Sequence, residues 1–206
     1  MPRGNVVDHQ AESDDGNTPL TEEELAGLIP THLSTKAELN QWEALNIAQA
    51  HGVIARRRPQ DVLSVDVLRD LHSRMFDRTW TWAGMCRRTD NNISPHPWAI
   101  VPMLLHDLVD NAHVRYDASD KTPEALDEVA ARFHHELVRI HPWTNGNGRH
   151  ARLATDLLLT QWGRPAFSWG SEADLVETGA SRSAYIQALR RADEGDFGPL
   201  LEFVRS

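Results

Sequence analysis

Residues 140–152 read "IHPWTNGNGRHAR", a loop rich in Asn and Gly that runs into a helical pattern over 149–163, "RHARLATDLLLTQWG". The start of a helix has unpaired N–H groups and a partial positive charge, so acids are favoured in its first turn. Here the first turn has no acid and carries Arg149, His150 and Arg152. This arrangement indicates a site that is completed by an anion from outside the chain.

The same loop has the features of a phosphate site. Gly146 and Gly148 allow backbone N–H groups to approach a ligand closely, and helix starts bind phosphate readily. Arg149 and Arg152 are three residues apart and can share one face of the first turn. We therefore expect a polyphosphate here. The competing interpretation is that both arginines are solvated and that the glycines only turn the chain.

Helical patterns lie on both sides of the loop. Thr122 and Pro123 predict the start of a helix that ends near residue 140, with an apolar stripe that includes Phe133 and Leu137. The segment 153–162 is apolar on nearly every side and is expected in the middle of a bundle. Further helices are predicted at 34–57, with Ser34 or Thr35 as cap, and at 64–76, 101–116, 181–192 and 198–204.

One stretch does not follow helical periodicity. Residues 79–94, "TWTWAGMCRRTDNNIS", are rich in Trp and Thr and contain a turn signal, which predicts a small β-hairpin. The expected fold class is therefore all-α, a helical bundle with one hairpin.

The N-terminal part differs in composition. Between Asp8 and Glu24 there are seven acids and no Lys or Arg, which favours a flexible arm. Thr21 and Glu24 form a capping-box pattern for one short helix. We expect an arm over residues 1–30 and one domain over 31–206.

Composition limits the possible settings and partners of the 206-residue chain. Its net charge of −9 argues against nucleic-acid binding. No signal peptide or membrane-spanning run is recognisable, so no membrane partner is expected. The single cysteine, Cys86, fits a reducing compartment, and we expect a cytoplasmic protein.

The stretch "HPWTNGNGRHAR" resembles the Fic family signature, HPFx(D/E)GNGRxxR, over its whole length. Residues 80–94 are similar to the hairpin of that family, called the flap, and "AYIQALRRADEGDFGPLLEFV" looks like its C-terminal helices. The resemblance spans about 34–204 and is nearest to bacterial Fic proteins of the mobile mystery protein B type.

The resemblance implies a protein adenylyltransferase, which moves AMP from ATP to a hydroxyl side chain of a target protein. His141 would be the general base. Asn147 and the N–H groups around Gly146 and Gly148 would line the anion hole, and Arg149 and Arg152 would hold the outer phosphates. Gly148 resembles the AMP-transferring members, because the phosphate-transferring Doc toxin has Lys there.

Asn145 departs from the family pattern. Most active members have Asp or Glu at this position for Mg²⁺, and a neutral amide is a weaker ligand. Asn145 is thus a weak metal candidate. The alternatives are a Fic fold that only binds or regulates, or an enzyme that uses another phosphate-containing donor.

Two further family features concern the target and regulation. The flap near Arg87–Ser94 would hold a target segment as an added strand, and self-modification is a second possibility. The stretch "STKAELN" is similar to an inhibitory segment in which Ser34 and Glu38 match, so Glu38 would pair with Arg152. The competing interpretation is a helix cap that uses the same residues.

A zinc protease is a rival class because "HHELVRIH" lies on a predicted helix. The HExxH pattern needs a second histidine at position 139, which is Arg139. We therefore expect His134 and His135 to be exposed or hydrogen-bonded and not to be metal ligands.

Overall fold

The computed structural model describes residues 20–54, 61–170, 175 and 179–206. These residues form helices and connecting turns. The elements in chain order are α1 (Glu22–Leu25), α2 (Lys36–Ile54), α3 (Val65–Phe76), the short 3₁₀ helix η2 (Trp98–Ile100), α4 (Val101–Ala118), α5 (Pro123–Ile140), α6 (Asn147–Gln161), α7 (Ala180–Asp193) and α8 (Gly198–Arg205). The expected all-α class is confirmed.

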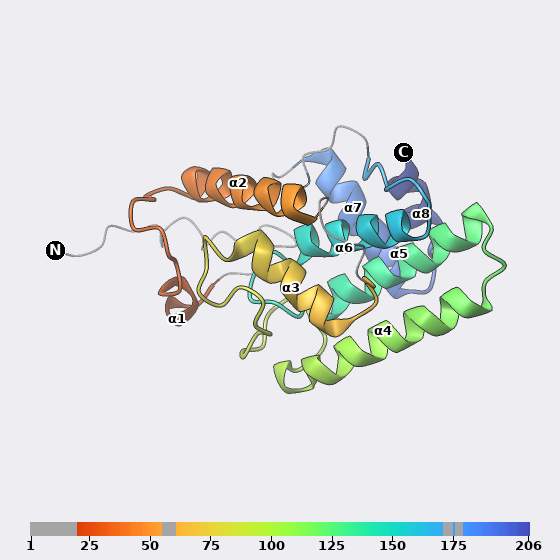
Figure 1. The fold of residues 1–206 in the computed structure, drawn as a ribbon, viewed down its shortest axis with the longest axis horizontal. Coiled ribbons are helices and arrows are strands. Elements are labelled where there is room, and N and C mark those ends of the chain that lie inside the picture. The colour runs from red at the N-terminus through yellow and green to blue at the C-terminus, as the bar shows by residue number, and fades with distance from the viewer. Residues whose placement is uncertain (1–19, 55–60, 171–174, 176–178) are drawn as a thin grey trace.

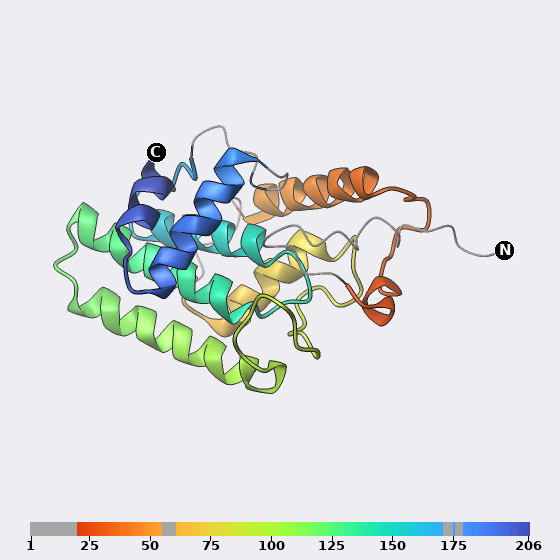
Figure 2. The same ribbon diagram turned by 180° about the vertical axis from the view of Figure 1, so that it is seen from behind.

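Helices α5 and α6 form the middle of the bundle (Figures 1 and 2). They pack against each other, α3 and α4 lie against them on one side, and α8 contacts α5 on the other side, with α7 packed on α8. Helix α2 lies along α3. Because the loop 141–146 joins the two central helices, packed elements hold it at both ends.

Local signals explain why these helices begin where they do. The hydroxyl of Thr122 accepts the Ala125 N–H, and Pro123 takes the first helical position, as predicted. Thr21 and Glu24 form the predicted capping box of α1. Helix α6 begins at Asn147, two residues before the predicted start, so half of the glycine loop belongs to its first turn.

The predicted β-hairpin at 79–94 is wrong. Within the described residues its backbone makes only two isolated bridges, and both lead to other segments: Trp80 pairs with Leu28, and Cys86 pairs with Trp143. The Arg87 N–H donates to the Pro142 carbonyl at 2.8 Å. The segment therefore satisfies its hydrogen bonds with the N-terminal segment and the α5–α6 loop, which leaves no ladder between its own halves.

The last third of the expected arm is packed on the domain. Leu20 is buried, the Ile29 N–H donates to the Thr79 carbonyl at 2.9 Å, and the Thr81 N–H donates to the Gly27 carbonyl at 2.9 Å. The indole of Trp82 donates to the Glu24 carbonyl at 3.0 Å. Residues 27–29, which follow α1, thus pair with 79–81, whereas residues 1–19 lie outside the described part.

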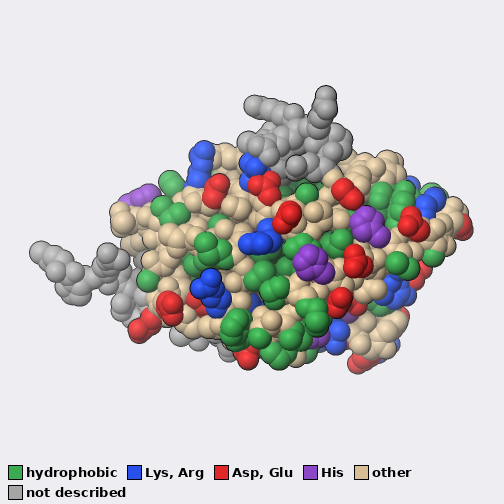
Figure 3. Space-filling model, turned by 60° about the horizontal axis from the view of Figure 1, so that its bottom comes forward, with side chains coloured by type: hydrophobic (Ala, Val, Ile, Leu, Met, Phe, Trp, Pro, Cys, Tyr) green, Lys and Arg blue, Asp and Glu red, His purple; other side chains and the backbone are tan. Residues whose placement is uncertain are grey.

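The surface over α4 mixes charge and apolar side chains. Figure 3 looks onto this side and shows hydrophobic groups gathered among acidic, basic and histidine side chains. Exposed large hydrophobic residues on η2 and α4 are Trp98, Ile100, Met103 and Val114. Among the described helices, none has the length and apolar character that crossing a membrane requires.

Candidate functional site at the start of α6

His141 ends α5 in a left-handed conformation, with φ 52° and ψ 59°, which is unusual for a residue with a side chain. Its Nδ1 lies 3.2 Å from the Val138 carbonyl, so Nδ1 carries the proton and Nε2 has the lone pair. Burial lowers the pKa of His141 to about 4. The imidazole is therefore neutral at pH 7, the form that a general base needs.

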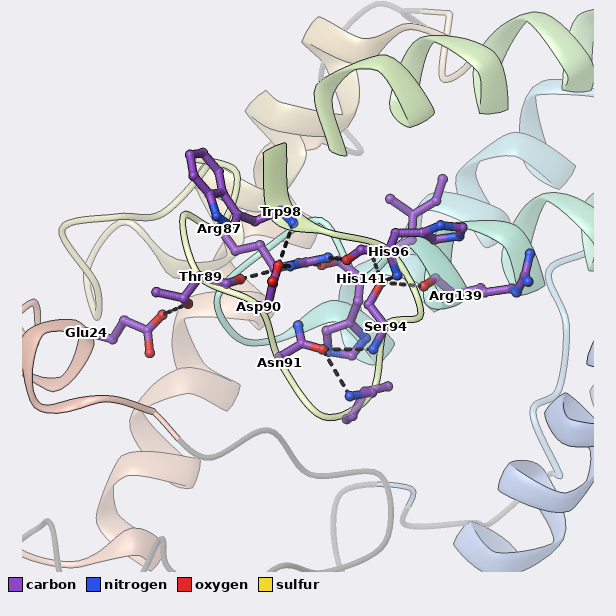
Figure 4. Close-up of polar contacts among 12 residues, drawn as sticks. Glu24, Arg87, Thr89, Asp90, Asn91, Ser94, His96, Trp98, Arg139 and His141 are labelled. Atoms are coloured by element: carbon purple, nitrogen blue, oxygen red, sulfur yellow. Dashed lines mark hydrogen bonds and ion pairs between the residues drawn. The ribbon is translucent and has the colours of Figure 1, made fainter. Parts of the chain in front are cut away.

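Arg87 holds the backbone of His141 in place. Its Nε donates to the His141 carbonyl at 2.9 Å, and its two Nη atoms donate to the carbonyls of Thr89 at 2.8 Å and His96 at 2.6 Å. Figure 4 shows this guanidinium lying between the 89–96 loop and His141. Arg87 is buried, so one side chain fixes the 89–96 loop to the loop 141–146.

The motif loop is closed by its own side chains. Asn147 accepts the Trp143 N–H at 2.9 Å and donates back to the Trp143 carbonyl at 2.8 Å. Gly146 has φ 78°, and a Cβ there would lie 2.4 Å from the Phe76 ring. Asn147 and Gly146 therefore shape the turn, while the N-cap Gly146 gives α6 no side-chain cap.

Two buried histidines hold this loop through hydrogen bonds. His72 accepts the Gly84 N–H at Nδ1, so its Nε2–H donates to the Asn145 carbonyl at 3.0 Å. His150 accepts the Trp143 indole N–H at Nδ1 and donates from Nε2 to the Leu68 carbonyl at 2.9 Å. Burial lowers the pKa of His72 well below its usual value and that of His150 to about 4. Both rings are thus neutral.

Arg149 has a carboxylate partner. Its Nη1 lies 2.6 Å from Oε2 of Glu43, whose Oε1 accepts the Trp80 indole N–H at 2.6 Å. Glu43 comes from α2 and is buried, and the guanidinium lies 5.0 Å from the centre of the Phe76 ring. The pair therefore ties α2 to the start of α6.

Arg152 is bound differently. Its guanidinium lies beside Tyr185 on α7, with Cζ 5.9 Å from the ring centre, and the residues that the structure describes give it no ion pair. Asp156, one turn along α6, is held instead by the Trp169 indole at 3.0 Å. Burial lowers the pKa of Arg152, and so do the positive charges of Arg149 and Arg182, while Tyr185 raises it.

Arg152 also lies beside Gly148. A Cβ at residue 148 would lie 3.5 Å from Arg152 Nη1, an ordinary van der Waals contact, so the guanidinium lies against the first turn of α6. Burial, the helix start and two neighbouring arginines all favour a negative ligand at this point. The structure thus brings His141 and the residues 145–152 together as one polar site at the junction of α5 and α6.

The predicted contact between Glu38 and Arg152 is wrong. Glu38 Oε2 accepts the Ser34 N–H at 2.8 Å, the Ser34 hydroxyl at 2.9 Å and the Thr35 N–H at 3.0 Å, and Thr35 accepts the Glu38 N–H. This is a capping box at the start of α2 on the exposed surface. These hydrogen bonds lower the pKa of the Glu38 carboxyl, with Ser34 the largest contributor.

The described residues do not fit a magnesium ion held by the protein. They contain no cluster of three His, Cys, Asp or Glu side chains that could hold a metal. Asn145 Oδ1 already accepts the Gly146 N–H at 2.6 Å. His134 and His135 are buried and bonded to Tyr185 and Asp193 at 2.8 and 2.9 Å, so they are hydrogen-bonded, as predicted, but not exposed.

Several residues of the site were not found from the sequence, namely Glu43, His72, Arg87, His134 and Tyr185. Each lies far along the chain from its partner: 106 residues separate Glu43 from Arg149, and 54 separate Arg87 from His141. The only local signal was the presence of charged or ring residues on otherwise apolar helix faces.

The comparisons with known proteins agree with this geometry. Residues 62–159 match the sequence model of the Fic/DOC family. The protein adenylyltransferase Fic of Nematostella vectensis is 29% identical over 198 residues, which is 92% of this chain and 43% of that protein. The chain thus spans about two fifths of the length of this curated relative.

Solved structures with the same arrangement include Fic-1 (residues 134–508) of C. elegans. It has a TM-score of 0.66 and 26% identity, covering 84% of this chain and 50% of that one. The N-terminal Fic domain of a Bartonella quintana VirB-translocated Bep effector, solved with bound ADP, has a TM-score of 0.67 at 16% identity and covers 84% and 86%. Since the motif 141–152 lies inside the matched segment and the fold is shared, the chain belongs to the Fic/DOC family.

Proposed function

We propose that this chain is a protein adenylyltransferase that moves AMP from ATP to a hydroxyl side chain of a target protein. The observation that carries the proposal is the convergence, at one helix start, of a neutral histidine and an arginine without an ion-pair partner among the described residues. The curated relative from Nematostella vectensis bears the name of this activity.

In the proposed reaction, Nε2 of His141 takes the proton from the target hydroxyl. The oxygen then forms a bond to the α-phosphorus of ATP, and the bond from that phosphorus to the β-phosphate oxygen breaks, releasing pyrophosphate. Positioning and charge neutralisation supply most of the catalysis. The left-handed backbone of His141 and the bond from Arg87 fix the base relative to the loop.

The phosphates are proposed to lie over the first turn of α6. In this pose the N–H groups around Gly146 and Gly148 face the α-phosphate, which is transferred, and Arg152 contacts the outer phosphates. A bound ADP in the Bartonella quintana Fic domain supports a nucleotide in this family's fold. Asn145 Oδ1 is engaged by the Gly146 N–H, and the steps proposed for His141 and Arg152 do not depend on a magnesium ligand from the protein.

The target is proposed to dock beside the 87–94 loop. A cavity of about 420 Å³ separates this loop from the N-terminal segment, and it is lined by Thr21, Glu24, Arg87, Thr89, Asp90, Asn91, Asn92 and the motif residue Thr144. Figure 4 shows Glu24 reaching Thr89 across it. Since the expected hairpin is absent, the target would meet this loop chiefly through side chains, and the chain's own hydroxyls are a second acceptor.

Restraint of the site by an acid of α2 is part of the proposal. The acid that supports this proposal is Glu43, because its carboxylate forms an ion pair with Arg149. Glu38 instead accepts hydrogen bonds at the start of α2. An outer phosphate and Glu43 compete for one guanidinium. The free, half-buried thiol of Cys86 agrees with the cytoplasmic setting that we propose.

The test uses ATP labelled at the α-phosphate and, in parallel, ATP labelled at the γ-phosphate, with the purified chain alone and with cell lysate, and mass spectrometry for AMP adducts. His141→Ala should lower transfer about a thousandfold while ATP affinity stays within a few-fold, because the base acts only in the chemical step. Transfer by His141→Ala at the wild-type rate, or transfer of the γ-label, would overturn the assignment.

A further inference from the structure

Behind Arg152 lies a buried chain of polar groups that the proposed reaction does not use. The centre of the Tyr185 ring lies 5.9 Å from Arg152 Cζ, and the Tyr185 hydroxyl lies 2.8 Å from His134 Nε2. On its other side, His134 Nδ1 lies 3.4 Å from Thr155 Oγ1, which in turn bonds the Ala151 carbonyl. Ala151 precedes Arg152 in α6, so the chain of bonds leaves α6, crosses α7 and α5, and returns to α6.

Arg152 sets the direction of every bond in this chain. A guanidinium only donates, so the Tyr185 oxygen must accept from Arg152. The Tyr185 proton is then donated to His134 Nε2, and His134 must carry its own proton on Nδ1. Thr155 Oγ1 donates its proton to the Ala151 carbonyl at 2.7 Å. The Thr155 oxygen is therefore left to accept the proton on His134 Nδ1.

The protonation states agree with this direction. Burial lowers the pKa of His134 to about 3, so the ring is neutral and Nε2 is an acceptor. Burial also raises the pKa of the Tyr185 hydroxyl, so it keeps its proton. Both residues are buried, and the Trp169 ring lies 4.5 Å from the imidazole. The Tyr185 hydroxyl therefore directs its proton toward His134 Nε2.

The chemistry of this partner matters for an anion site. A carboxylate at the same point would neutralise Arg152 and would compete with a phosphate for its N–H groups. A phenol oxygen takes one N–H and leaves the positive charge uncancelled. Each guanidinium has five donors, so the other donors can still meet an anion.

Resting on the nucleotide site proposed above, we propose that Tyr185 is a positioning residue for this chain's reaction. Directed by His134, its hydroxyl holds Arg152 beside the first turn of α6 while leaving the positive charge available for the outer phosphates of ATP.

The test is Tyr185→Phe, which keeps the ring and removes only the hydroxyl. Tyr116→Phe is the matched control, because Tyr116, the other tyrosine of the chain, stacks on Trp162 away from the site. Dissociation constants for ATP and for AMP are measured with each variant, together with the transfer rate and the thermal unfolding midpoint.

We expect Tyr185→Phe to weaken ATP binding about tenfold and to leave AMP binding within twofold, since AMP lacks the outer phosphates that Arg152 meets. Tyr116→Phe should change neither. In an Arg152→Gln background, Tyr185→Phe should have no further effect on ATP affinity. A merely structural tyrosine would weaken both nucleotides alike and would add its effect to that of Arg152→Gln.

The outcomes separate the two proposals. If the wild type transfers AMP and Tyr185→Phe binds ATP as the wild type does, the positioning role is wrong and the enzyme assignment stands. If the wild type binds ATP without transferring AMP, the enzyme assignment fails and the ATP-to-AMP comparison still decides the role of Tyr185. Absence of ATP binding to the wild type would overturn both.

Discussion

The two motif arginines stand one turn apart on α6 and have opposite kinds of partner. Arg149 meets the buried carboxylate of Glu43 at 2.6 Å, whereas Arg152 lies beside the neutral Tyr185, with Cζ 5.9 Å from the ring centre. The first cation is neutralised inside the protein, and the second keeps its charge beside a bare helix start. We infer from this difference that Arg149 chiefly holds the fold, and we propose that Arg152 binds a negatively charged ligand.

A neutral buried histidine lies near each arginine. His150 follows Arg149 in α6, and His134 bonds Tyr185, which lies beside Arg152. With His141, their pKa values are lowered to about 4, 3 and 4 by burial. The unfolded chain binds protons on these rings below about pH 6.5 and the folded chain does not. Their contribution to stability is therefore full above pH 6.5 and is lost as the pH falls toward 4.

The largest expected effect is thus a fall in the free energy of unfolding as the pH is lowered. At pH 5 each such histidine should lower the free energy of unfolding by ~2 kcal/mol relative to pH 7.5. Urea unfolding across this range measures the loss. His141→Ala should reduce the slope by about one proton. A flat profile between pH 7.5 and 5 would show that these rings are charged or solvated.

A smaller effect is expected from removing the carboxylate partner of Arg149. Glu43→Gln keeps the acceptor for the Trp80 indole and ends the ion pair, so Arg149 becomes available to phosphate. We expect ATP affinity and AMP transfer to rise about three- to fivefold, and the free energy of unfolding to fall by ~2–3 kcal/mol because a half-buried charge loses its partner.

Glu38→Gln is the matched change on the same helix and should have the smallest effect. Its carboxylate touches only Ser34 and Thr35, so the loss is confined to the cap of α2, and labelling should equal that of the wild type. If labelling rises with Glu38→Gln and not with Glu43→Gln, the restraint acts through the acid that the sequence pattern indicated.

The sequence was sufficient where the signal is local. Thr122 and Pro123, and Thr21 with Glu24, marked helix starts because capping involves residues three apart. The charge of Arg149 and Arg152 against the helix dipole marked the site for the same reason. Both kinds of inference need only neighbours in the chain.

The sequence was insufficient where partners come from distant segments. The pairing of Glu43 with Arg149 and the bonds from Arg87 to three carbonyls depend on how α2 and the 87–96 loop pack. The hairpin prediction failed for the same reason. Trp and Thr favoured an extended backbone at 79–82, but the N-terminal segment supplied its partner.

Parallel replacement of the two arginines tests the central claim most directly. Arg152→Gln and Arg149→Gln are each titrated with ATP and unfolded in urea. We predict that Arg152→Gln weakens ATP binding about a hundredfold with stability near that of the wild type, since it removes a cation that has no ion pair with the described residues. Arg149→Gln should weaken binding less than about tenfold and lower the free energy of unfolding by ~3 kcal/mol, because it leaves the buried carboxylate of Glu43 unpaired. Equal effects of the two changes on ATP binding, or a greater loss of stability from Arg152→Gln, would contradict the account.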